Sequence, residues 1–306
     1  MEYVINVNHL TKDFGHGRGV FDVSFGVEEG ICFGYLGPNG AGKSTTIRML
    51  MGFTHPDKGG AFINSGEVLK DRARVMQGVC YVPGEIALPP NLTGNDVLKI
   101  QRELKGVKDV TEMNRLISMF QLDPSILCKE MSLGMRRKLV IVSAFLSKPK
   151  VIILDEPSSG LDPEMQETFV ELIKEKKEEG NTILLSSHIF NEVDRLADKI
   201  AIIKDGKIVS FFKADELKHK SLKTYRISFK DEKERHSFLN RNYSTIKIVD
   251  PSTNNFGVMV AIEDKDITNA LRDISKEEIS DFSEKKETLE DYFMSFYKEE
   301  RTYERL

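Results

Sequence analysis

The chain has 306 residues and a formal net charge of −4, so composition disfavours a general nucleic-acid binder. Hydrophobic residues make up 40% of it, which suits a globular protein with a substantial core. The three cysteines, Cys32, Cys80 and Cys128, form no CxxC pair, and this favours reduced thiols over a disulfide framework or a zinc site.

The sequence predicts no signal peptide and no membrane span. Its N-terminal residues, MEYVINVNHL, lack a basic segment followed by an apolar one. The longest apolar run, LVIVSAFL at 139–146, is far shorter than the roughly 20 residues that cross a bilayer.

The first two hundred residues predict an α/β domain. Strand-like runs at 3–7, 19–27 and 31–36 precede a glycine-rich turn and a helix that reaches about Met51. Short strands and a short helix are expected over 60–83.

A helical subdomain is predicted at about 93–147, where the apolar spacing becomes helical. The pattern then returns to alternating strands and helices. The expected elements are a strand at 151–155, a helix from Asp162-Pro163 to Gly180, a strand at 182–187, a helix near 189–197, and a hairpin at 199–212 that turns at Asp205-Gly206.

A polar, charged segment near 215–222 divides the chain into a first domain at 1–215 and a small domain at 222–306. The second part has a β-α-β-β-α-β order, which predicts a ferredoxin-like α+β domain, with a last helix over 288–300. Its histidines, His219 and His236, have no ligand-like neighbours and are interpreted as surface residues.

Residues 37–44, GPNGAGKS, match the phosphate-binding pattern GxxxxGK[ST] between a strand and a helix. This context disfavours a chance match in a turn. Backbone N–H groups would wrap the phosphates, Lys43 would reach the β- and γ-phosphates, and Ser44 would bind Mg²⁺. The predicted nucleotide-binding residues here are Gly37, Pro38, Asn39, Gly40, Ala41, Gly42, Lys43, Ser44 and Thr45.

Two acids follow the apolar strand VIILD. Asp155 at its end is predicted to supply the second Mg²⁺ contact, and Glu156 to act as the general base that polarises water. The alternative is a strand capped by two solvated acids, which the upstream phosphate loop disfavours.

The helix that begins at Ser132 carries Arg136, Arg137 and Lys138 in its opening turns. Cations there oppose the helix dipole by about 0.3–1 kcal/mol each when exposed. Either an anion sits in front of the helix or these residues form a solvated basic face.

Five segments occur in order over residues 3–213: GPNGAGKST, YVPGEIALPPNLTG, MSLGMRRKL, VIILDEPSSGLDP and SSH. Together they resemble an ATP-binding cassette (ABC) ATPase, the nucleotide-hydrolysing subunit of membrane transporters. The resemblance implies a P-loop NTPase cassette with an antiparallel β-subdomain and a helical subdomain, and ATP and Mg²⁺ as cofactors.

The resemblance also implies roles for particular residues. Ser132 and Gly134 match the signature stretch, which binds the γ-phosphate held by the other protomer of a head-to-tail dimer. Phe14 matches the aromatic that stacks on adenine, although a core phenylalanine is the alternative. His188 matches the histidine that contacts the γ-phosphate, and residues 159–162, ending in Asp162, match the loop that crosses the dimer interface.

The sequence departs from the family pattern at two places. The usual signature is LSGGQ, and here Met131, Leu133 and Met135 replace three of its residues. The family's Mg²⁺-binding Gln is replaced by Gly84, and we expect the neighbouring Glu85 to substitute for it in part at the metal. The alternative is that Glu85 points to solvent or to the permease.

The single cassette, its loop at 83–86 and its C-terminal part resemble the drug and antibiotic exporter branch. The expected partners are a second cassette, as a homodimer or heterodimer, and a separately encoded membrane permease, with no nucleic acid. The expected location is the cytoplasmic face of the membrane. The alternatives are an importer ATPase, an ATP-binding regulator with weak or no hydrolysis, and a soluble cassette protein acting on ribosomes or DNA.

Overall fold

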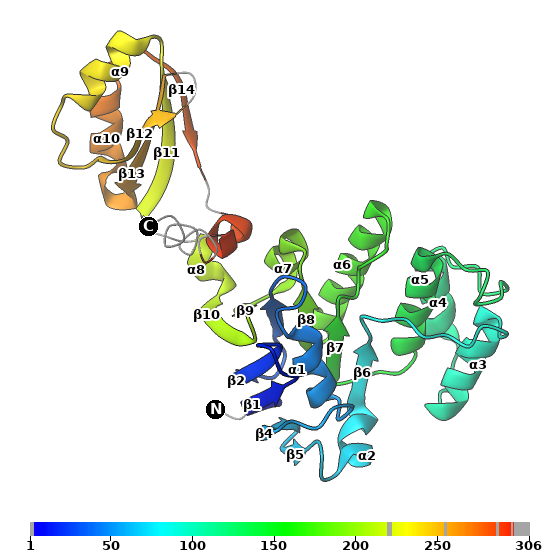
Figure 1. Ribbon diagram of the computed structural model, residues 1–306. Coiled ribbons are helices and arrows are strands. Elements are labelled where there is room, and N and C mark those ends of the chain that lie inside the picture. The colour runs from blue at the N-terminus through cyan, green and yellow to red at the C-terminus, as the bar shows by residue number, and fades with distance from the viewer. Residues whose placement is uncertain (1–2, 219–221, 254–255, 286–287, 295, 297–306) are drawn as a thin grey trace. The chain divides into compact units, whose positions relative to one another are not determined.

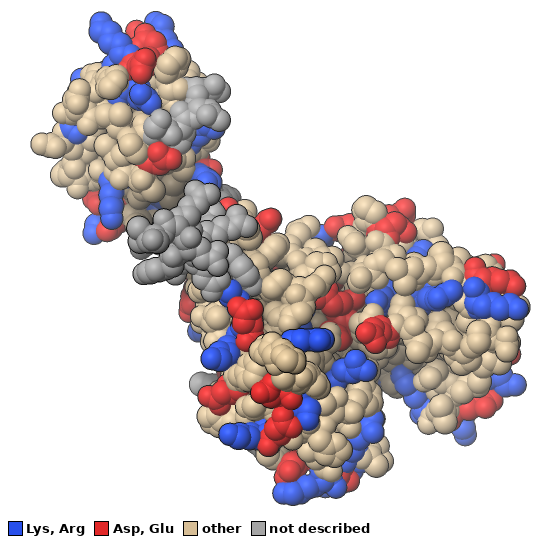
Figure 2. Space-filling model, in the orientation of Figure 1, with Lys and Arg blue, Asp and Glu red and all other residues tan. Residues whose placement is uncertain are grey.

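The structure is a computed structural model that describes residues 3–218, 222–253, 256–285, 288–294 and 296 (Figure 1). The chain divides into two compact units, Met1–Ala214 and Asp215–Leu306. Acidic and basic side chains are interspersed on the face of each unit shown in Figure 2, so no broad surface of one sign covers that face.

A six-stranded sheet forms the centre of the first unit, and five of its strands are parallel. In spatial order the strands are β10 (Lys207–Lys213), β9 (Lys199–Lys204), β3 (Cys32–Leu36), β8 (Thr182–Ser187), β7 (Val151–Asp155) and β6 (Val79–Val82). Every residue of β3, β7 and β8 is buried. This explains their continuous apolar sequences, because parallel strands are covered on both faces.

The phosphate-loop helix lies between two sheets. The second sheet is antiparallel, in the order β2 (Gly19–Val27), β1 (Ile5–Asp13), β4 (Lys58–Ile63) and β5 (Gly66–Glu67). Helix α1 (Lys43–Leu50) contacts β1, β2 and β4 on this side and β7 of the parallel sheet on the other. Its Ile47 and Leu50 are fully buried in the core between the sheets. The start of α1 is therefore held from both sides.

The predicted helical subdomain contains α3 (Gly94–Leu104), α4 (Thr111–Met119) and α5 (Leu133–Ala144). Thr93 and Asp96 form a capping box at the start of α3. Helix α5 contacts α3, α4 and β6, and its Leu139 lies in one core cluster with Ile152 of the parallel sheet. The remaining helices of the first unit are α2 (Arg72–Val75), η1 (Met76–Gly78), α6 (Pro163–Glu178), α7 (Phe190–Leu196) and the start of α8 (Ala214–Lys218).

The three cysteines are buried and free. Burial raises the pKa of the Cys32 and Cys80 thiols to about 12, so both stay protonated near neutral pH.

The second unit has the β-α-β-β-α-β order that the sequence predicts. Its four strands form one antiparallel sheet in the order β12-β13-β11-β14, and Ile227, Phe238 and Val260 belong to its core. Its elements are β11 (Leu222–Phe229), α9 (Glu232–Leu239), β12 (Lys247–Thr253), β13 (Gly257–Glu263), η2 (Asp264–Asp266), α10 (Ile267–Ile274) and β14 (Ile279–Glu284).

Some predictions for the second unit fall outside the described residues. His236 is exposed on α9, as interpreted from the sequence, whereas His219 is not described. Residues 289–294 are helical, and most of the remainder of the predicted last helix is not described. No helix in the described parts of the chain is both long enough and apolar enough to cross a membrane.

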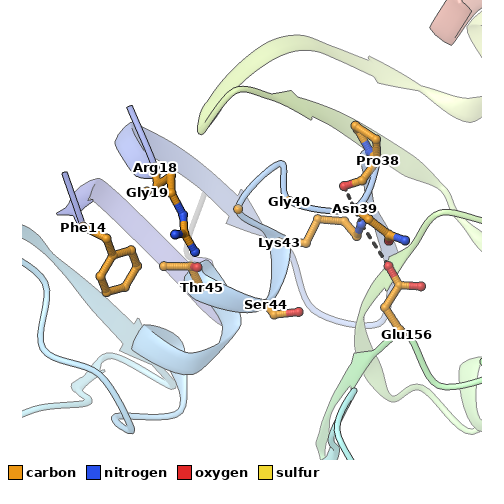
Figure 3. A pocket seen from close by; sticks show the side chains of 11 residues that line it. Phe14, Arg18, Gly19, Pro38, Asn39, Gly40, Lys43, Ser44, Thr45 and Glu156 are labelled. Carbon is orange, nitrogen blue, oxygen red and sulfur yellow. Dashed lines mark hydrogen bonds and ion pairs between the residues drawn. The ribbon is translucent and has the colours of Figure 1, made fainter. Parts of the chain in front are cut away.

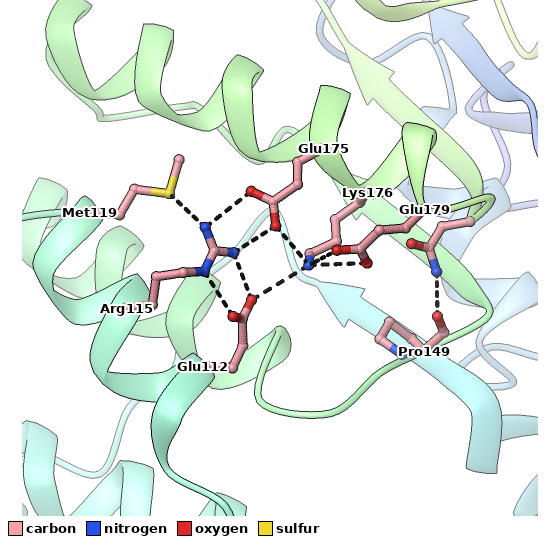
Figure 4. A network of polar contacts seen from close by, with 8 residues as sticks. Glu112, Arg115, Met119, Pro149, Glu175, Lys176 and Glu179 are labelled. Atoms are coloured by element: carbon pink, nitrogen blue, oxygen red, sulfur yellow. Dashed lines mark hydrogen bonds and ion pairs between the residues drawn. The ribbon is translucent and has the colours of Figure 1, made fainter.

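An ion-pair network connects the helical subdomain to α6 (Figure 4). The Arg115 guanidinium on α4 forms a bidentate pair with Glu112, at 2.7 and 2.8 Å, and another with Glu175 of α6, at 2.8 and 3.0 Å. The Lys176 ammonium lies 3.2 Å from Glu175 and 3.0 Å from Glu179. Arg115 therefore holds two carboxylates from different helices around one cation.

We expect Arg115→Leu to weaken the docking of α4 on α6, because Glu112 and Glu175 would lose the guanidinium that pairs with both through two hydrogen bonds each and would keep only the longer contacts of Lys176. The side chains are partly exposed, so the free energy of unfolding should fall by about 1 kcal/mol or less. Urea unfolding would measure this, and the loss should shrink in about 1 M salt. Arg102→Leu is the control, since Arg102 donates through Nε to the Val107 carbonyl within its own subdomain. Equal losses in both variants would contradict a role for the network.

Candidate active site

The strand order brings the separate sequence motifs to one edge of the parallel sheet. Strand β3 runs into the phosphate loop, and its Leu36 pairs with Ser187 of β8. On the other side of β8, Ser186 pairs with Asp155 at the end of β7. The carboxyl ends of parallel strands meet at the same edge of a sheet. The phosphate loop therefore starts at this edge, and Asp155 and His188 lie there too.

The phosphate loop holds the buried Lys43 side chain in a fixed position (Figure 3). The Lys43 ammonium donates to the carbonyl of Gly37 at 2.6 Å and that of Pro38 at 3.1 Å, and it lies 2.9 Å from the Glu156 carboxylate. Gly42, at φ +107°, precedes the helix, and a Cβ there would lie 2.5 Å from Val20 Cγ1. Only glycine fits this turn.

Asp155 and Ser44, the two predicted metal ligands from different motifs, lie together. The Ser44 hydroxyl donates to Asp155 Oδ1 at 3.1 Å, and the Ser186 hydroxyl donates to the same oxygen at 2.7 Å. Burial raises the pKa of Asp155, with the two hydroxyls opposing that shift. A buried carboxylate beside a hydroxyl is a donor set of hard oxygens that suits Mg²⁺.

Glu156 connects Lys43 to His188. Its backbone has φ +49°, in the left-handed region that a residue with a side chain rarely adopts. One carboxylate oxygen lies 2.9 Å from the Lys43 ammonium, and the other is hydrogen-bonded to His188 Nδ1. Strained backbone of this kind is found at functional sites, where surrounding contacts maintain it. Both predicted catalytic residues are thus in direct contact.

Phe14 is exposed and lines a pocket with the phosphate loop, so the alternative of a core phenylalanine is wrong. Its side chain is 56% exposed, and it lines one pocket of about 320 Å³ with Lys43, Ser44 and Thr45 (Figure 3). Arg18 lines the same pocket and was not singled out from the sequence. The sequence feature that could have pointed to Arg18 is its place four residues after Phe14.

A second pocket of about 430 Å³ shares Asn39, Ser44 and Glu156 with the first, and its lining also includes Asp155, His188 and Glu85. Glu85 is 93% exposed, and its carboxylate lies 4.0 Å from the Arg48 guanidinium. The described residues include no group of three or more His, Cys, Asp or Glu side chains placed to hold a metal. A role for Glu85 at the metal therefore stays a prediction.

Gly84 lies directly against Asp155. A Cβ at this position would be 3.1 Å from Asp155 Oδ2 and 3.3 Å from the Asp155 carbonyl oxygen. The backbone of the loop thus occupies the space beside the buried carboxylate, where a longer residue would need a neighbour to shift.

The signature residues lie apart from both pockets. Ser132 caps α5 by accepting a hydrogen bond from the Met135 N–H, and Asp162 caps α6 by accepting one from the Met165 N–H. Neither residue, nor Gly134, lines the pockets that contain Lys43 or His188. Within one chain, the structure does not bring these predicted contacts to the nucleotide loop.

The basic residues at the start of α5 do not all form the solvated face that was one of the two alternatives from the sequence. Arg137 is only 2% exposed, and its guanidinium donates to backbone carbonyls of two loops. Sequence reasoning missed this residue, because nothing local separates it from Arg136 and Lys138.

Comparisons with known proteins show what this chain is similar to. A family model described as "ABC transporter" matches residues 20–159, and one described as "AAA domain, putative AbiEii toxin, Type IV TA system" matches residues 125–194. The chain is 34% identical over 241 residues to the bacitracin transport ATP-binding protein BcrA of Bacillus licheniformis, an alignment that covers 76% of this chain and 77% of BcrA. The chain belongs to the family of ABC transporter ATP-binding proteins.

A further relative of this ABC cassette extends the likeness to the second unit. The uncharacterized ABC transporter ATP-binding protein YcbN of Bacillus subtilis (strain 168) is 30% identical over 311 residues, covering 96% of this chain and 97% of YcbN. A solved structure of an ATP-binding subunit of an ABC transporter is 31% identical, with a TM-score of 0.64, and covers 70% of this chain and 92% of the other.

The ABC cassette also contains a buried acid that its sequence motifs do not mark. Glu192 on α7 is buried, and its Oε2 accepts a hydrogen bond of 2.6 Å from the Ser187 hydroxyl, next to His188. Burial raises the pKa of Glu192 above its ordinary value of 4.5, and the Ser187 hydroxyl opposes that shift.

We expect Glu192→Gln to stabilise the cassette near neutral pH. As the pH rises through the ordinary value of 4.5, the carboxyl ionises in the unfolded chain before it does in the folded one, so the free energy of unfolding falls. Gln keeps an acceptor for Ser187 and cannot ionise. Thermal unfolding at about pH 4 and about pH 8 should show a higher Tm for the variant only at the higher pH.

The control for that experiment is Glu178→Gln, because Glu178 is exposed on α6. Its Tm should follow that of the wild-type cassette at both pH values. A Glu192→Gln variant that unfolds at a lower temperature than wild type at both pH values would contradict the raised pKa of the buried Glu192.

Proposed function

We propose that the chain is an Mg²⁺-dependent ATPase subunit that drives a separate membrane permease, as part of an exporter. The observation that carries the proposal is the Glu156 carboxylate, held between the Lys43 ammonium and His188 at the end of β7. A candidate base therefore lies beside the residue that would hold the γ-phosphate.

Each side chain has a distinct part in this proposal. Lys43 exchanges its contact with Glu156 for the β- and γ-phosphate oxygens, which frees the Glu156 carboxylate to take a proton from water. His188 keeps Glu156 oriented and contacts the γ-phosphate. Ser44 and Asp155 would hold Mg²⁺, which supplies charge neutralisation at the phosphates. Glu85, in the lining of the second pocket, is the further candidate for that metal.

ATP would bind along one pocket. Phe14 offers an exposed ring for the adenine, and residues 37–45 offer backbone N–H groups and the start of α1 to the phosphates. The signature residues Ser132 and Gly134 would complete the site of a second cassette in a head-to-tail dimer, which is either a homodimer or a heterodimer. Their separation from the pockets of their own chain supports this arrangement.

The exporter assignment rests on the relatives. BcrA is named for bacitracin transport, and another relative, LnrL of Bacillus subtilis (strain 168), is named for linearmycin resistance. We further propose that the chain acts at the cytoplasmic face of the membrane, bound to its permease. The second candidate is an ATP-binding regulator or importer ATPase with weak hydrolysis, which Gly84 and Leu133 favour because they replace family residues at the nucleotide.

We expect Glu156→Gln to lower kcat for ATP hydrolysis by about 10²–10⁴-fold, because the amide keeps the size of the side chain but cannot accept the proton. ATP binding should survive. Turnover of the purified protein, measured with and without Mg²⁺, checks both the base and the metal. Glu178→Gln is the matched control and should hydrolyse ATP like the wild type. A wild-type protein that binds ATP without hydrolysing it would favour the regulator.

We expect Ser132→Arg to block ATP-driven dimerisation, because it would place a long cation where the partner's phosphate should lie. Light scattering in a Glu156→Gln background, which should accumulate the dimer, measures this. Ser118→Arg adds the same side chain to an exposed position on α4 and should leave the dimer intact. A normal dimer yield from Ser132→Arg would remove residues 132–134 from the interface.

A further inference from the structure

Arg137 is a buried cation whose guanidinium contacts two loops at once. Its Nη1 donates to the Pro83 carbonyl at 2.6 Å, its Nη2 to the Gly84 carbonyl at 2.7 Å, and its Nε to the Ser159 carbonyl at 3.0 Å. The first two acceptors follow β6 and the third follows β7. All three guanidinium nitrogens are therefore used, each on backbone from outside the helical subdomain.

Only arginine offers this arrangement of donors. Its guanidinium is planar, stays charged, and presents five N–H groups in a rigid fork, whereas the lysine ammonium is a single point of charge. Burial lowers the pKa of Arg137, and the nearby Asp155 and Glu156 carboxylates oppose that shift. A buried charge with three carbonyl acceptors is costly to leave unpaired, so the contacts of Arg137 oppose separation of the two loops from the helix.

The held backbone reaches the centre of the site. The Gly84 backbone lies against Asp155, where a Cβ would be 3.1 Å from Oδ2. The Ser159 N–H donates at 3.2 Å to the carbonyl of Glu156. Arg137 thus holds the neighbours of the candidate metal ligand and of the candidate base, and it does so from the helix that Ser132 caps.

We propose that Arg137 is a positioning residue that couples α5 to the loop at 83–84 and to the loop at 159. One connection between the helical subdomain and the ATPase core therefore runs through the backbone carbonyls that Arg137 holds. Contact of Ser132 and Gly134 with a partner's nucleotide would move α5, and Arg137 carries that movement to Gly84 and Ser159. The effect on turnover rests on the proposed function.

The first experiment needs no nucleotide. In Arg137→Lys and Arg137→Met, the amides of Ser159 and Leu161, which are hydrogen-bonded within their loop, should exchange with deuterium at least about tenfold faster. The chain contains no Trp, so Ala87→Trp at an exposed position supplies a single fluorescence reporter for the other loop. Its anisotropy should fall in both Arg137 variants and stay unchanged in Arg102→Met.

The second experiment measures ATP turnover. Both variants should keep the dissociation constant of ATP for the monomer within about twofold while kcat falls by about 10²-fold, as expected for misplaced catalytic groups. Added guanidinium should restore part of kcat in Arg137→Ala, and the same concentration of ammonium should not, since only the planar fork reaches three carbonyls.

The outcomes separate this inference from the proposed function. Wild-type exchange and anisotropy in folded Arg137→Lys and Arg137→Met would overturn the role of Arg137, whatever the turnover. A wild-type protein without ATPase activity would overturn the proposed function, while the exchange experiment would still decide whether Arg137 holds the two loops. Equal loss of kcat in Arg102→Met would also count against a specific role for Arg137.

Discussion

The Lys43 ammonium is a buried charge at the start of α1, and most of the site follows from satisfying it. Two carbonyls of its own loop accept its hydrogen bonds, and Glu156 supplies the opposite charge. Because removing one partner of a buried pair leaves an uncompensated charge, this contact holds the end of β7 against the phosphate loop. His188 then joins through Glu156, so three strand ends are linked before any nucleotide binds.

A second buried cation, Arg137, likewise holds separate segments together where the helical subdomain meets the parallel sheet. Arg137 binds only carbonyls, whereas Lys43 also binds a carboxylate. In the proposed function, phosphate oxygens displace Glu156 from Lys43, whereas the acceptors described for Arg137 are backbone carbonyls. Under that proposal, Lys43 changes partners when the nucleotide binds and Arg137 keeps its partners.

Much of the fold and site was predictable because its determinants are local. The glycine pattern at 37–44 reports a backbone turn, and β7 and β8 read as buried strands because both of their faces are covered. Helices were expected to begin at Ser132 and at Asp162-Pro163, and the side chains of Ser132 and Asp162 cap them. Arg137, Arg18 and Glu192 were missed, because their surroundings come from segments distant in the sequence.

The sequence motifs were therefore sufficient for the class of protein, through the resemblance that they carry, and for the position of the phosphate loop and of the acids after β7. The contact of Glu156 with both Lys43 and His188 depended on the strand order, because β7, β8 and β3 are neighbours in the sheet and not in the chain. Packing likewise placed the Gly84 backbone on Asp155 and enclosed Arg137. Short-range patterns carry no information about such contacts, since burial and pairing arise only when distant segments close around the same side chain.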